Sequence, residues 1–545
     1  MVTCLALLFA AAGIANAQEA ERMRAHDDLI DGHDDPALIT PPVIHDPGRE
    51  YGPETRPFQG IPGIERAPNG RLWATWYGGG PGEGPWNYVM LNTSDDDGET
   101  WSDVRLIVDP PGRVRAFDPC LWLDPLGRLW LFWAQAWQMW DGRAGVWAIV
   151  TENPDDEEPQ WSEPRRLCDG IMMNKPLVLS NGEWLLPAAI WPNRPSVEEE
   201  YLRESEDGSG SNVIVSTDQG ATWEYRGGVD IPGRRCDEHM LIERGDGTLW
   251  LLARTTYGIG ESISHDQGRT WSEGRQSWIP HIPTARFFIR RLASGNLILV
   301  KHSPPDGRTR SHLTAYLSED DGYTWRGGLE LDDRRGVSYP DGTQAEDGTI
   351  YIIYDYDRYG DKQILMATFT EEDVLAEEPV SDRARFQVEV NRATGVSERR
   401  RVVLLDHADA APLMEEPAAE LELEDDGQEW STLKMGEKVF TDRDYVVEDL
   451  PEALEGARFV RGSINNISAT VESEGVVWVL TPMAERNDDS LEVALLRKGF
   501  EAAAVREFII FLGSAANAVT VFQKQLAAGD TIELGKWGVL ALPAD

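Results

Sequence analysis

Short apolar and aromatic runs alternate with polar turns along the first two thirds of the chain. Runs such as LWATW, LWLFWA and LWLLAR each begin two positions after a turn glycine. Glycine adopts the positive φ that a tight hairpin requires, and aromatic and β-branched residues suit a half-buried strand. Each turn with its flanking runs therefore predicts a β-hairpin. The turns lie at 69–70, 126–127, 181–182, 246–247, 294–295 and 347–348.

The spacing of these turns predicts the fold. The six turn glycines recur roughly every 50 to 65 residues, which is the length of one four-stranded propeller blade. A second repeat, Ser-x-Asp-x-Gly-x-Thr-Trp, starts at Ser94, Ser216, Ser264 and Ser318. We expect its Ser and Asp oxygens to accept hydrogen bonds from turn amides and its Trp to pack between strands. Together the two repeats predict an all-β protein containing a six-bladed β-propeller.

Changes in this pattern divide the chain. An apolar run ending in Ala15-Asn16-Ala17 is typical of a secretory signal cleaved after Ala17, so we expect a secreted or periplasmic protein. From Trp430 the hairpin repeat stops, although apolar runs typical of strands continue. The predicted organisation is a signal peptide at 1–17, a polar lead-in at 18–50, the propeller at 51–377, an acidic linker region at 378–429 and a β-rich ancillary domain at 430–545.

Charge and composition exclude several classes of partner. The chain carries 51 basic and 94 acidic residues, a net charge of −43. Such a surface repels nucleic acid and anionic membranes, and no stretch after the signal is apolar for long enough to span a bilayer. The sequence has no strong nucleotide-binding loop and no cluster with metal-ligand spacing, so we expect no cofactor and no metal. Nothing in the sequence indicates the oligomeric state.

The hairpin register places reactive groups around the predicted central channel. Equivalent positions on the inner strands of a propeller face one another at one mouth. These positions, counted back from the turn glycines, are Ile61, Asp118, Lys175, Glu238, Arg286 and Tyr339. The second strands contribute Tyr77, Arg254, His302 and Asp355. Because burying so many charges for structure alone is rarely favourable, we interpret the ring as an anion-recognising active site, with a closed ion-pair network as the alternative.

These residues resemble the sialidase (neuraminidase) superfamily over about residues 51–377. That family pairs a catalytic Glu with an Arg on the next strand, and EHMLIERGDGTLWLLAR places Glu238 and Arg254 at the same separation. A further family Arg precedes a Leu-Thr strand, as Arg310 does in RSHLTAYLSEDDG. The family's nucleophilic Tyr begins a strand, as Tyr339 does in GVSYPDGTQAEDGTIYIIYD, and Asp355 stands where a Glu is usual.

The resemblance implies a retaining exo-glycosidase that releases a terminal acidic sugar from a glycan. A sialoside carries a carboxylate beside its anomeric carbon, and that charge would repel a carboxylate nucleophile. A phenol that loses its proton to Glu238 avoids this repulsion, so Tyr339 would attack the sugar. Arg254 and Arg310 would bind the substrate carboxylate through charge-assisted hydrogen bonds.

Two positions depart from the family pattern. The family opens its first blade with Phe-Arg-Ile-Pro, whereas this chain has Gly60 where that arginine belongs. The loop before the first Ser/Asp repeat contains no Asp, so Glu83 or Asp118 is the expected acid/base. The missing arginine leaves the sugar open between sialic acid and a related acidic sugar, with Arg115 or Lys175 as a replacement cation. The remaining expected substrate contacts are Arg286, His302 and Asp355.

Two other functions fit the same residues. A polysaccharide lyase, or a hydrolase, could act on a uronate-containing polysaccharide; in the lyase an Arg neutralises the uronate carboxylate while Tyr339 or His302 removes the C5 proton. A lyase product would absorb in the near ultraviolet, whereas hydrolysis leaves no double bond. A non-catalytic carbohydrate-binding propeller would have no need of a Tyr339–Glu238 pair, and Tyr339→Phe would leave its affinity nearly intact.

Overall fold

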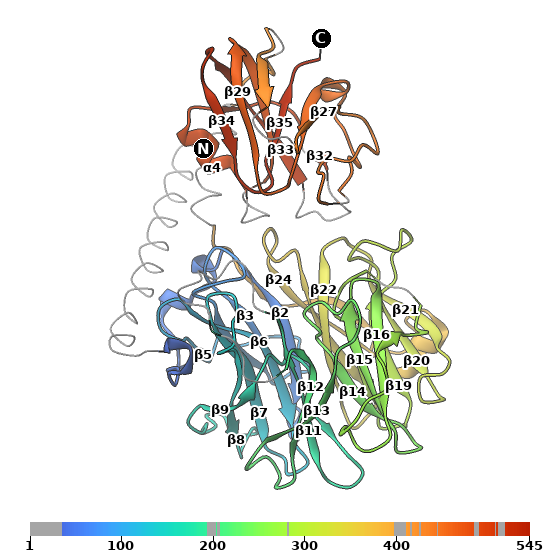
Figure 1. Cartoon of the computed structure of the whole chain (residues 1–545). Coiled ribbons are helices and arrows are strands. Elements are labelled where there is room, and N and C mark those ends of the chain that lie inside the picture. The colour runs from blue at the N-terminus through green and yellow to red at the C-terminus, as the bar shows by residue number, and fades with distance from the viewer. Residues whose placement is uncertain are drawn as a thin grey trace. The chain divides into compact units, whose positions relative to one another are not determined.

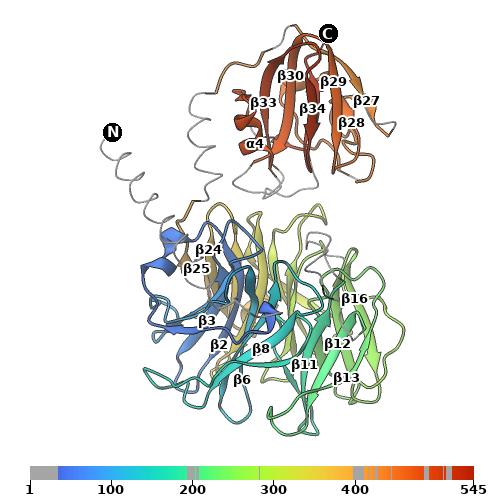
Figure 2. The same ribbon diagram turned by 60° about the vertical axis from the view of Figure 1, so that its left-hand side comes forward.

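The computed structural model forms two compact units, Met1–Gly395 and Val396–Asp545 (Figures 1 and 2). It describes residues 35–192, 203, 208–280, 283–396, 410–414, 417–423, 427–443, 445–483, 490–506, 508–510 and 518–544. The predicted signal at 1–17 and the first part of the lead-in lie outside the described residues. Within the described residues, no helix combines the length and the apolarity needed to cross a membrane.

The described residues of the first unit form six antiparallel sheets, and in each of them four strands follow one another in chain order. The first three blades are β2 (Gln59–Arg66), β3 (Leu72–Gly78), β4 (Tyr88–Ser94) and β5 (Leu106–Val108); β6 (Val114–Leu123), β7 (Leu129–Trp137), β8 (Gly145–Thr151) and β9 (Arg165–Asp169); and β10 (Leu177–Val178), β11 (Trp184–Ile190), β12 (Gly210–Ser216) and β13 (Glu224–Val229). The last three are β14 (Met240–Glu243), β15 (Leu249–Thr255), β16 (Gly258–Ser264) and β17 (Arg275–Gln276); β18 (Phe288–Arg291), β19 (Leu297–His302), β20 (Leu313–Ser318) and β21 (Arg326–Asp332); and β22 (Val337–Gln344), β23 (Ile350–Tyr356), β24 (Gln363–Phe369) and β25 (Arg385–Arg392).

The first strands of the blades line the centre, and β2 packs beside both β6 of the next blade and β22 of the last. This contact closes the ring, so the predicted six-bladed β-propeller is confirmed. The first blade also gains β1 (Val43–His45) from the lead-in, which pairs with β5. Short 3-10 turns at Pro36–Leu38, Arg49–Tyr51 and Pro53–Thr55 flank β1.

The Ser/Asp repeats form identical turns between third and fourth strands. In the first repeat the Gly98 amide donates to Ser94 Oγ at 2.9 Å, and the Thr100 amide donates to Asp96 Oδ1 at 2.9 Å. The same bonds recur at Ser216, Ser264 and Ser318, and the Trp of each repeat packs against a hydrophobic cluster. The predicted structural role of the repeat is therefore confirmed.

The propeller extends beyond the boundary predicted at residue 377. Strand β25 lies in the stretch predicted as linker, yet it pairs with β24 as the outer strand of the last blade. This blade lacks the Ser/Asp turn, and the helix α2 (Glu371–Ala376), capped by the Thr370 side chain, connects its third and fourth strands instead. The loss of the repeat removed the pattern by which the end of the blade could be located.

The described residues of the second unit form two sheets. The larger has the order β27 (Glu429–Thr432), β28 (Arg458–Arg461), β35 (Val539–Leu542), β30 (Gly475–Pro482), β33 (Ala518–Leu526) and β31 (Glu501–Ala502), with β32 (Phe508–Ile509) also on β33. The smaller consists of β26 (Glu420–Leu423), β29 (Ile467–Ser473) and β34 (Thr531–Leu534), so one strand of this domain lies within the predicted linker. A shared apolar core joins the two sheets, and α4 (Glu492–Arg497) and a 3-10 turn at Glu452–Leu454 complete the predicted β-rich domain.

Candidate active site

The inner strands bend at one shared position. Ile61, Asp118, Glu238 and Tyr339 all have left-handed backbones, with φ of 56°, 50°, 47° and 52°. In the three blades that contain Ile61, Asp118 and Tyr339, the strand pairing also shifts register at this point. A non-glycine residue in this conformation costs on the order of 1–3 kcal/mol, and such strain is typical of functional sites. The bend therefore supports the equivalence that the turn spacing predicted for these four positions.

A buried phenol–carboxylate–guanidinium cluster occupies the centre. The Tyr339 hydroxyl donates to Glu238 Oε1 at 3.0 Å, and Arg254 Nη1 donates to the same oxygen at 2.5 Å. Arg254 Nη1 also lies 3.3 Å from the Tyr339 oxygen. Burial, and after it the Glu238 carboxylate, raises the pKa of Tyr339 above its usual range. Glu238 Oε2 has no hydrogen-bond partner among the described residues.

Two further arginines flank the Tyr339 ring. The guanidinium carbon of Arg310 lies 5.6 Å from the ring centroid, and that of Arg358 lies 5.2 Å from it. Arg310 is oriented by donating to Ser338 Oγ and to the Thr284 carbonyl, both at 3.1 Å. Three guanidinium groups, including that of Arg254, thus surround one phenol. Such a cluster of fixed cations suits an anionic ligand.

Arg358 occupies the space above Gly60, and the sequence analysis did not identify this residue. A Cβ at Gly60 would lie 2.3 Å from Arg358 Cδ and 2.6 Å from Cγ, so only glycine leaves room for the side chain. Arg358 forms an ion pair with Glu83, and its Nε lies 4.0 Å from Asp355 Oδ2. It comes from the loop between β23 and β24, outside the hairpin register. A basic residue three positions after the axial Asp355 was the signal that could have revealed it.

The two replacement cations expected from the sequence are both engaged by other protein groups. Lys175 donates to the carbonyls of Ile64 and Leu121, both at 2.6 Å, and to Glu65 at 3.2 Å. All three ammonium protons thus bind acceptors of the protein, so Lys175 ties neighbouring blades together and has no donor for a ligand. Arg115 stacks on the Phe117 ring at 3.8 Å and donates to the Tyr77 hydroxyl at 3.3 Å, within the same mouth.

Three residues expected to contact substrate make hydrogen bonds that hold the bent strands. Arg286 donates to Asn174 Oδ1 at 2.8 Å and approaches the Tyr339 carbonyl at 3.5 Å, while Asp355 Oδ2 accepts the Ile61 amide at 2.8 Å. His302 Nε2 lies 2.9 Å from the Val337 carbonyl, and burial lowers the pKa of His302 to about 3. All three side chains are buried. Each holds a neighbouring strand through these contacts, whereas Asp355 Oδ1 and His302 Nδ1 have no hydrogen-bond partner among the described residues.

The two acid/base candidates have contrasting surroundings. Burial raises the pKa of Asp118 to about 8, so its carboxyl group carries a proton at neutral pH. Glu83, whose side chain is 35% exposed, is paired with the Arg358 guanidinium. Pairs of carboxyl groups held in different states are typical of glycosidase acid/base sites.

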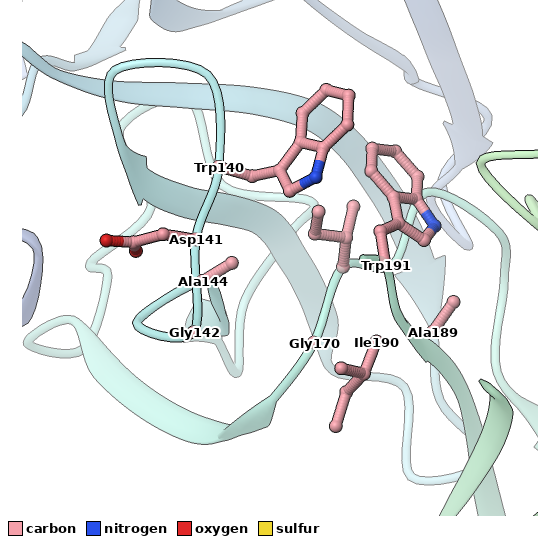
Figure 3. A pocket seen from close by; sticks show the side chains of 9 residues that line it. Trp140, Asp141, Gly142, Ala144, Gly170, Ala189, Ile190 and Trp191 are labelled. Atoms are coloured by element: carbon pink, nitrogen blue, oxygen red, sulfur yellow. The ribbon is translucent and has the colours of Figure 1, made fainter. Parts of the chain in front are cut away.

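Two tryptophans lie at the rim of the same mouth, on loops between second and third strands. The Trp140 and Trp191 rings meet edge to face, with centroids 5.0 Å apart and planes at 79° (Figure 3). The cavity beside them measures about 10 Å³, which holds no more than one water molecule. This aromatic pair is therefore a packed part of the rim and not a sugar pocket. Among the described residues, no group of three or more His, Cys, Asp or Glu side chains could hold a metal ion.

Comparison with solved structures yields several similar chains of low identity. A Hadza microbial sialidase is 19% identical over 58% of this chain and 66% of its own length, just under two thirds, with a TM-score of 0.45. The NanB sialidase of Streptococcus pneumoniae is 14% identical over 59% of this chain and 70% of its own, with a TM-score of 0.44. A Penicillium chrysogenum α-L-arabinanase is 15% identical over 62% of this chain and 99% of its own, with a TM-score of 0.41.

Among curated proteins, no sequence matches the chain. The family model described as the BNR repeat-like domain matches residues 70–352, just over half of the chain. The match begins at the first hairpin turn and ends within β23, so it includes the four Ser/Asp repeats and Glu238, Arg254 and Tyr339. The chain belongs to the family of proteins with a BNR repeat-like domain.

Proposed function

We propose that this protein is a secreted sialidase-like exo-glycosidase that hydrolyses a terminal acidic sugar, sialic acid or a related sugar, with retention of configuration. One observation carries the proposal: the Tyr339 hydroxyl donates a hydrogen bond to Glu238, and three guanidinium groups surround this pair. A binding protein needs cations for an anionic sugar, but it has no need of a phenol–carboxylate pair.

In the proposed reaction the Tyr339 oxygen attacks the anomeric carbon as its proton passes to Glu238. The bond to the leaving oxygen breaks, and that oxygen takes a proton from Asp118. Water then attacks the tyrosyl-linked sugar, giving a proton back to Asp118, while the Tyr339 oxygen recovers its own from Glu238. The proton that Asp118 holds at neutral pH supports this assignment.

Arg254, Arg310 and Arg358 would bind the carboxylate of the sugar. Hydrogen bonds to charged groups contribute about 1.5–3 kcal/mol each, and more where water is excluded. Arg358 supplies the third cation in place of the side chain absent at Gly60, and Glu83 orients it through their ion pair. Export is part of the proposal and rests on the signal pattern at residues 1–17.

The test is release of free sialic acid from α2,3- and α2,6-sialyllactose by the mature protein beside Tyr339→Phe. A matched control is Tyr354→Phe, which removes another buried hydroxyl from the same blade, one that donates to Asp332 at 3.1 Å. Release that is lost only in Tyr339→Phe supports the proposal. If neither compound is cleaved, oligosaccharides ending in a uronate follow, with absorbance monitored.

A product that absorbs in the near ultraviolet would identify a polysaccharide lyase and overturn the hydrolase proposal. Binding of these sugars without turnover, unchanged in Tyr339→Phe, would identify a carbohydrate-binding propeller. The low pKa of buried His302 makes it a weak base at neutral pH, so His302 does not favour the lyase.

A further inference from the structure

The position at the end of the inner strand, next to the hairpin turn, holds a buried cation in only one of the six blades. At the end of each inner strand, an amide donates to the carbonyl four residues later across the hairpin, and this bond identifies the equivalent positions. They are Ala67, Asp124, Leu179, Arg244, Leu292 and Ala345. Four are apolar, and Asp124 is paired with Arg128 and with the Trp130 indole. Arg244 is therefore the exception among the six.

The Arg244 guanidinium is buried without complete hydrogen bonding. The residue is 7% exposed, and its Nε and Nη2 have no hydrogen-bond partner among the described residues. Its guanidinium carbon lies 4.3 Å from the ring centroid of Trp250, 5.4 Å from that of Trp278 and 5.0 Å from that of Tyr323. Aromatic faces attract a cation but accept none of its hydrogen bonds. Buried donors in this state need a partner, because each missing bond costs free energy.

Arg244 lines an open depression of about 730 Å³ between the fourth and fifth blades, the green to yellow part of Figure 1. The depression lies among the hairpin and Ser/Asp turns, at the opposite end of the blades from the bent strand starts at Tyr339. Its rim carries charges of both signs, with Arg275 bonded to Glu261 at 2.9 Å. The charged or titratable groups on the rim are Asp246, His265, Glu273 and Arg275.

An aromatic stack stands beside this cation. The Trp250 and Trp278 rings stack with centroids 5.2 Å apart, and the Trp278 and Tyr323 rings follow at 6.0 Å, nearly parallel. Tyr323 is 59% exposed, so a flat apolar face is open to solvent beside the guanidinium. A few convergent polar donors beside exposed aromatic faces are the usual composition of a small-ligand site.

We propose that this depression is a second carbohydrate-binding site, which takes a sugar unit bearing a carboxylate or a sulfate. The oxyanion binds the edge of the Arg244 guanidinium that lines the depression, and the sugar ring packs on the exposed Tyr323 face. In a protein of net charge −43, a recessed cation provides the local attraction that the surface as a whole lacks. The site is separate from the Tyr339 cluster and does not depend on its chemistry.

The test measures binding of methyl glucuronide, glucose 6-sulfate and neutral methyl glucoside to the full chain at physiological salt. Saturation-transfer NMR detects the binding. The variants are Arg244→Gln and Tyr323→Ala. Tyr225→Ala is the matched control, because Tyr225 is also an exposed tyrosine, at 55%, outside this depression. Arg310→Ala shows how much of the signal comes from the central cluster.

In the Arg310→Ala background we expect an anionic probe still to bind, with affinity lowered at least tenfold by Arg244→Gln and clearly lowered by Tyr323→Ala, but unchanged by Tyr225→Ala. The carboxylate and sulfate probes distinguish the two anions. The proposal is overturned if no anionic probe binds, if the neutral probe binds equally well, or if Tyr323→Ala leaves binding unchanged. Tyr323→Ala decides the matter even if Arg244→Gln fails to fold. Hydrolysis by the central cluster is measured separately, so either proposal can fail alone.

Discussion

The substitution Gly60→Ala tests how Arg358 is placed. The added methyl would lie 2.3 Å from Arg358 Cδ, so the side chain must move by about 1 Å to restore an ordinary contact. Gly60 does not have the left-handed backbone that would disfavour alanine. Because Arg358 is long and flexible, we expect it to swing away, at a cost to the free energy of unfolding below about 1.5 kcal/mol.

The loss of function should exceed the loss of stability. Displacing Arg358 removes one charge-assisted contact to the substrate carboxylate, worth about 1.5–3 kcal/mol, which corresponds to a roughly 10- to 150-fold lower kcat/KM. A displacement of this size at a catalytic site can by itself cost about 100-fold. The assay is steady-state hydrolysis of the acidic glycoside identified by the release experiment, with thermal unfolding measured in parallel.

The controls isolate Arg358 as the cause. Gly63→Ala lies on the same strand, and its methyl would meet nothing closer than Thr75 Cγ2 at 3.3 Å, so activity should stay within about twofold of the wild-type value. In a double-mutant cycle, Gly60→Ala should add nothing to Arg358→Ala, since both remove one interaction. Wild-type activity in Gly60→Ala, or additive losses in the double variant, would refute the reasoning.

Three further predictions concern the carboxyl groups and the buried network. Asp118→Asn should lower kcat/KM strongly for sialyllactose but little for a nitrophenyl glycoside, because the nitrophenyl leaving group needs no proton. Glu83→Gln should lower kcat/KM for both substrates alike. Equal behaviour of the two variants would reassign the acid. Because the folded pKa of Asp118, about 8, lies above its ordinary value of 3.8, its contribution to stability is full at low pH and declines as pH rises from about 4 to 8, by up to about 1.4 kcal/mol per unit. Urea unfolding should therefore show a flatter pH profile in Asp118→Asn, and an unchanged profile would contradict the assignment. Arg286→Met should cost about 3–5 kcal/mol of unfolding free energy, because it leaves Asp341, 3.4 Å away, with a weaker counterion; a loss below 1 kcal/mol in a denaturant titration would argue against its structural role.

The blades were predictable because their signals are local. Each hairpin has its own turn glycine, and each Ser/Asp turn binds its own amides, as Ser94 and Asp96 do. The end of the propeller was not predictable, because the last blade replaces that turn with the helix that begins after Thr370. Sequence patterns thus locate a repeat but not the element that substitutes for it.

The central cluster was predictable in part for a related reason. The strand register brings Glu238, Arg254 and Tyr339 together, since each occupies a fixed place relative to its turn. The same register could not show that Lys175 would bind backbone carbonyls of neighbouring blades. It also could not show that a loop residue, Arg358, would fill the space left by Gly60, because that contact joins segments far apart in the chain.

In the proposed reaction Tyr339 becomes covalently bonded to the sugar, and mass spectrometry of acid-quenched enzyme during turnover detects this bond. A substrate that carries fluorine beside the anomeric centre slows the second step and lets the intermediate accumulate. We expect a mass increase of one sugar unit on the peptide that contains Tyr339, absent in Tyr339→Phe and present in Tyr354→Phe. Turnover by the wild-type protein without this adduct, or turnover retained in Tyr339→Phe, would contradict it.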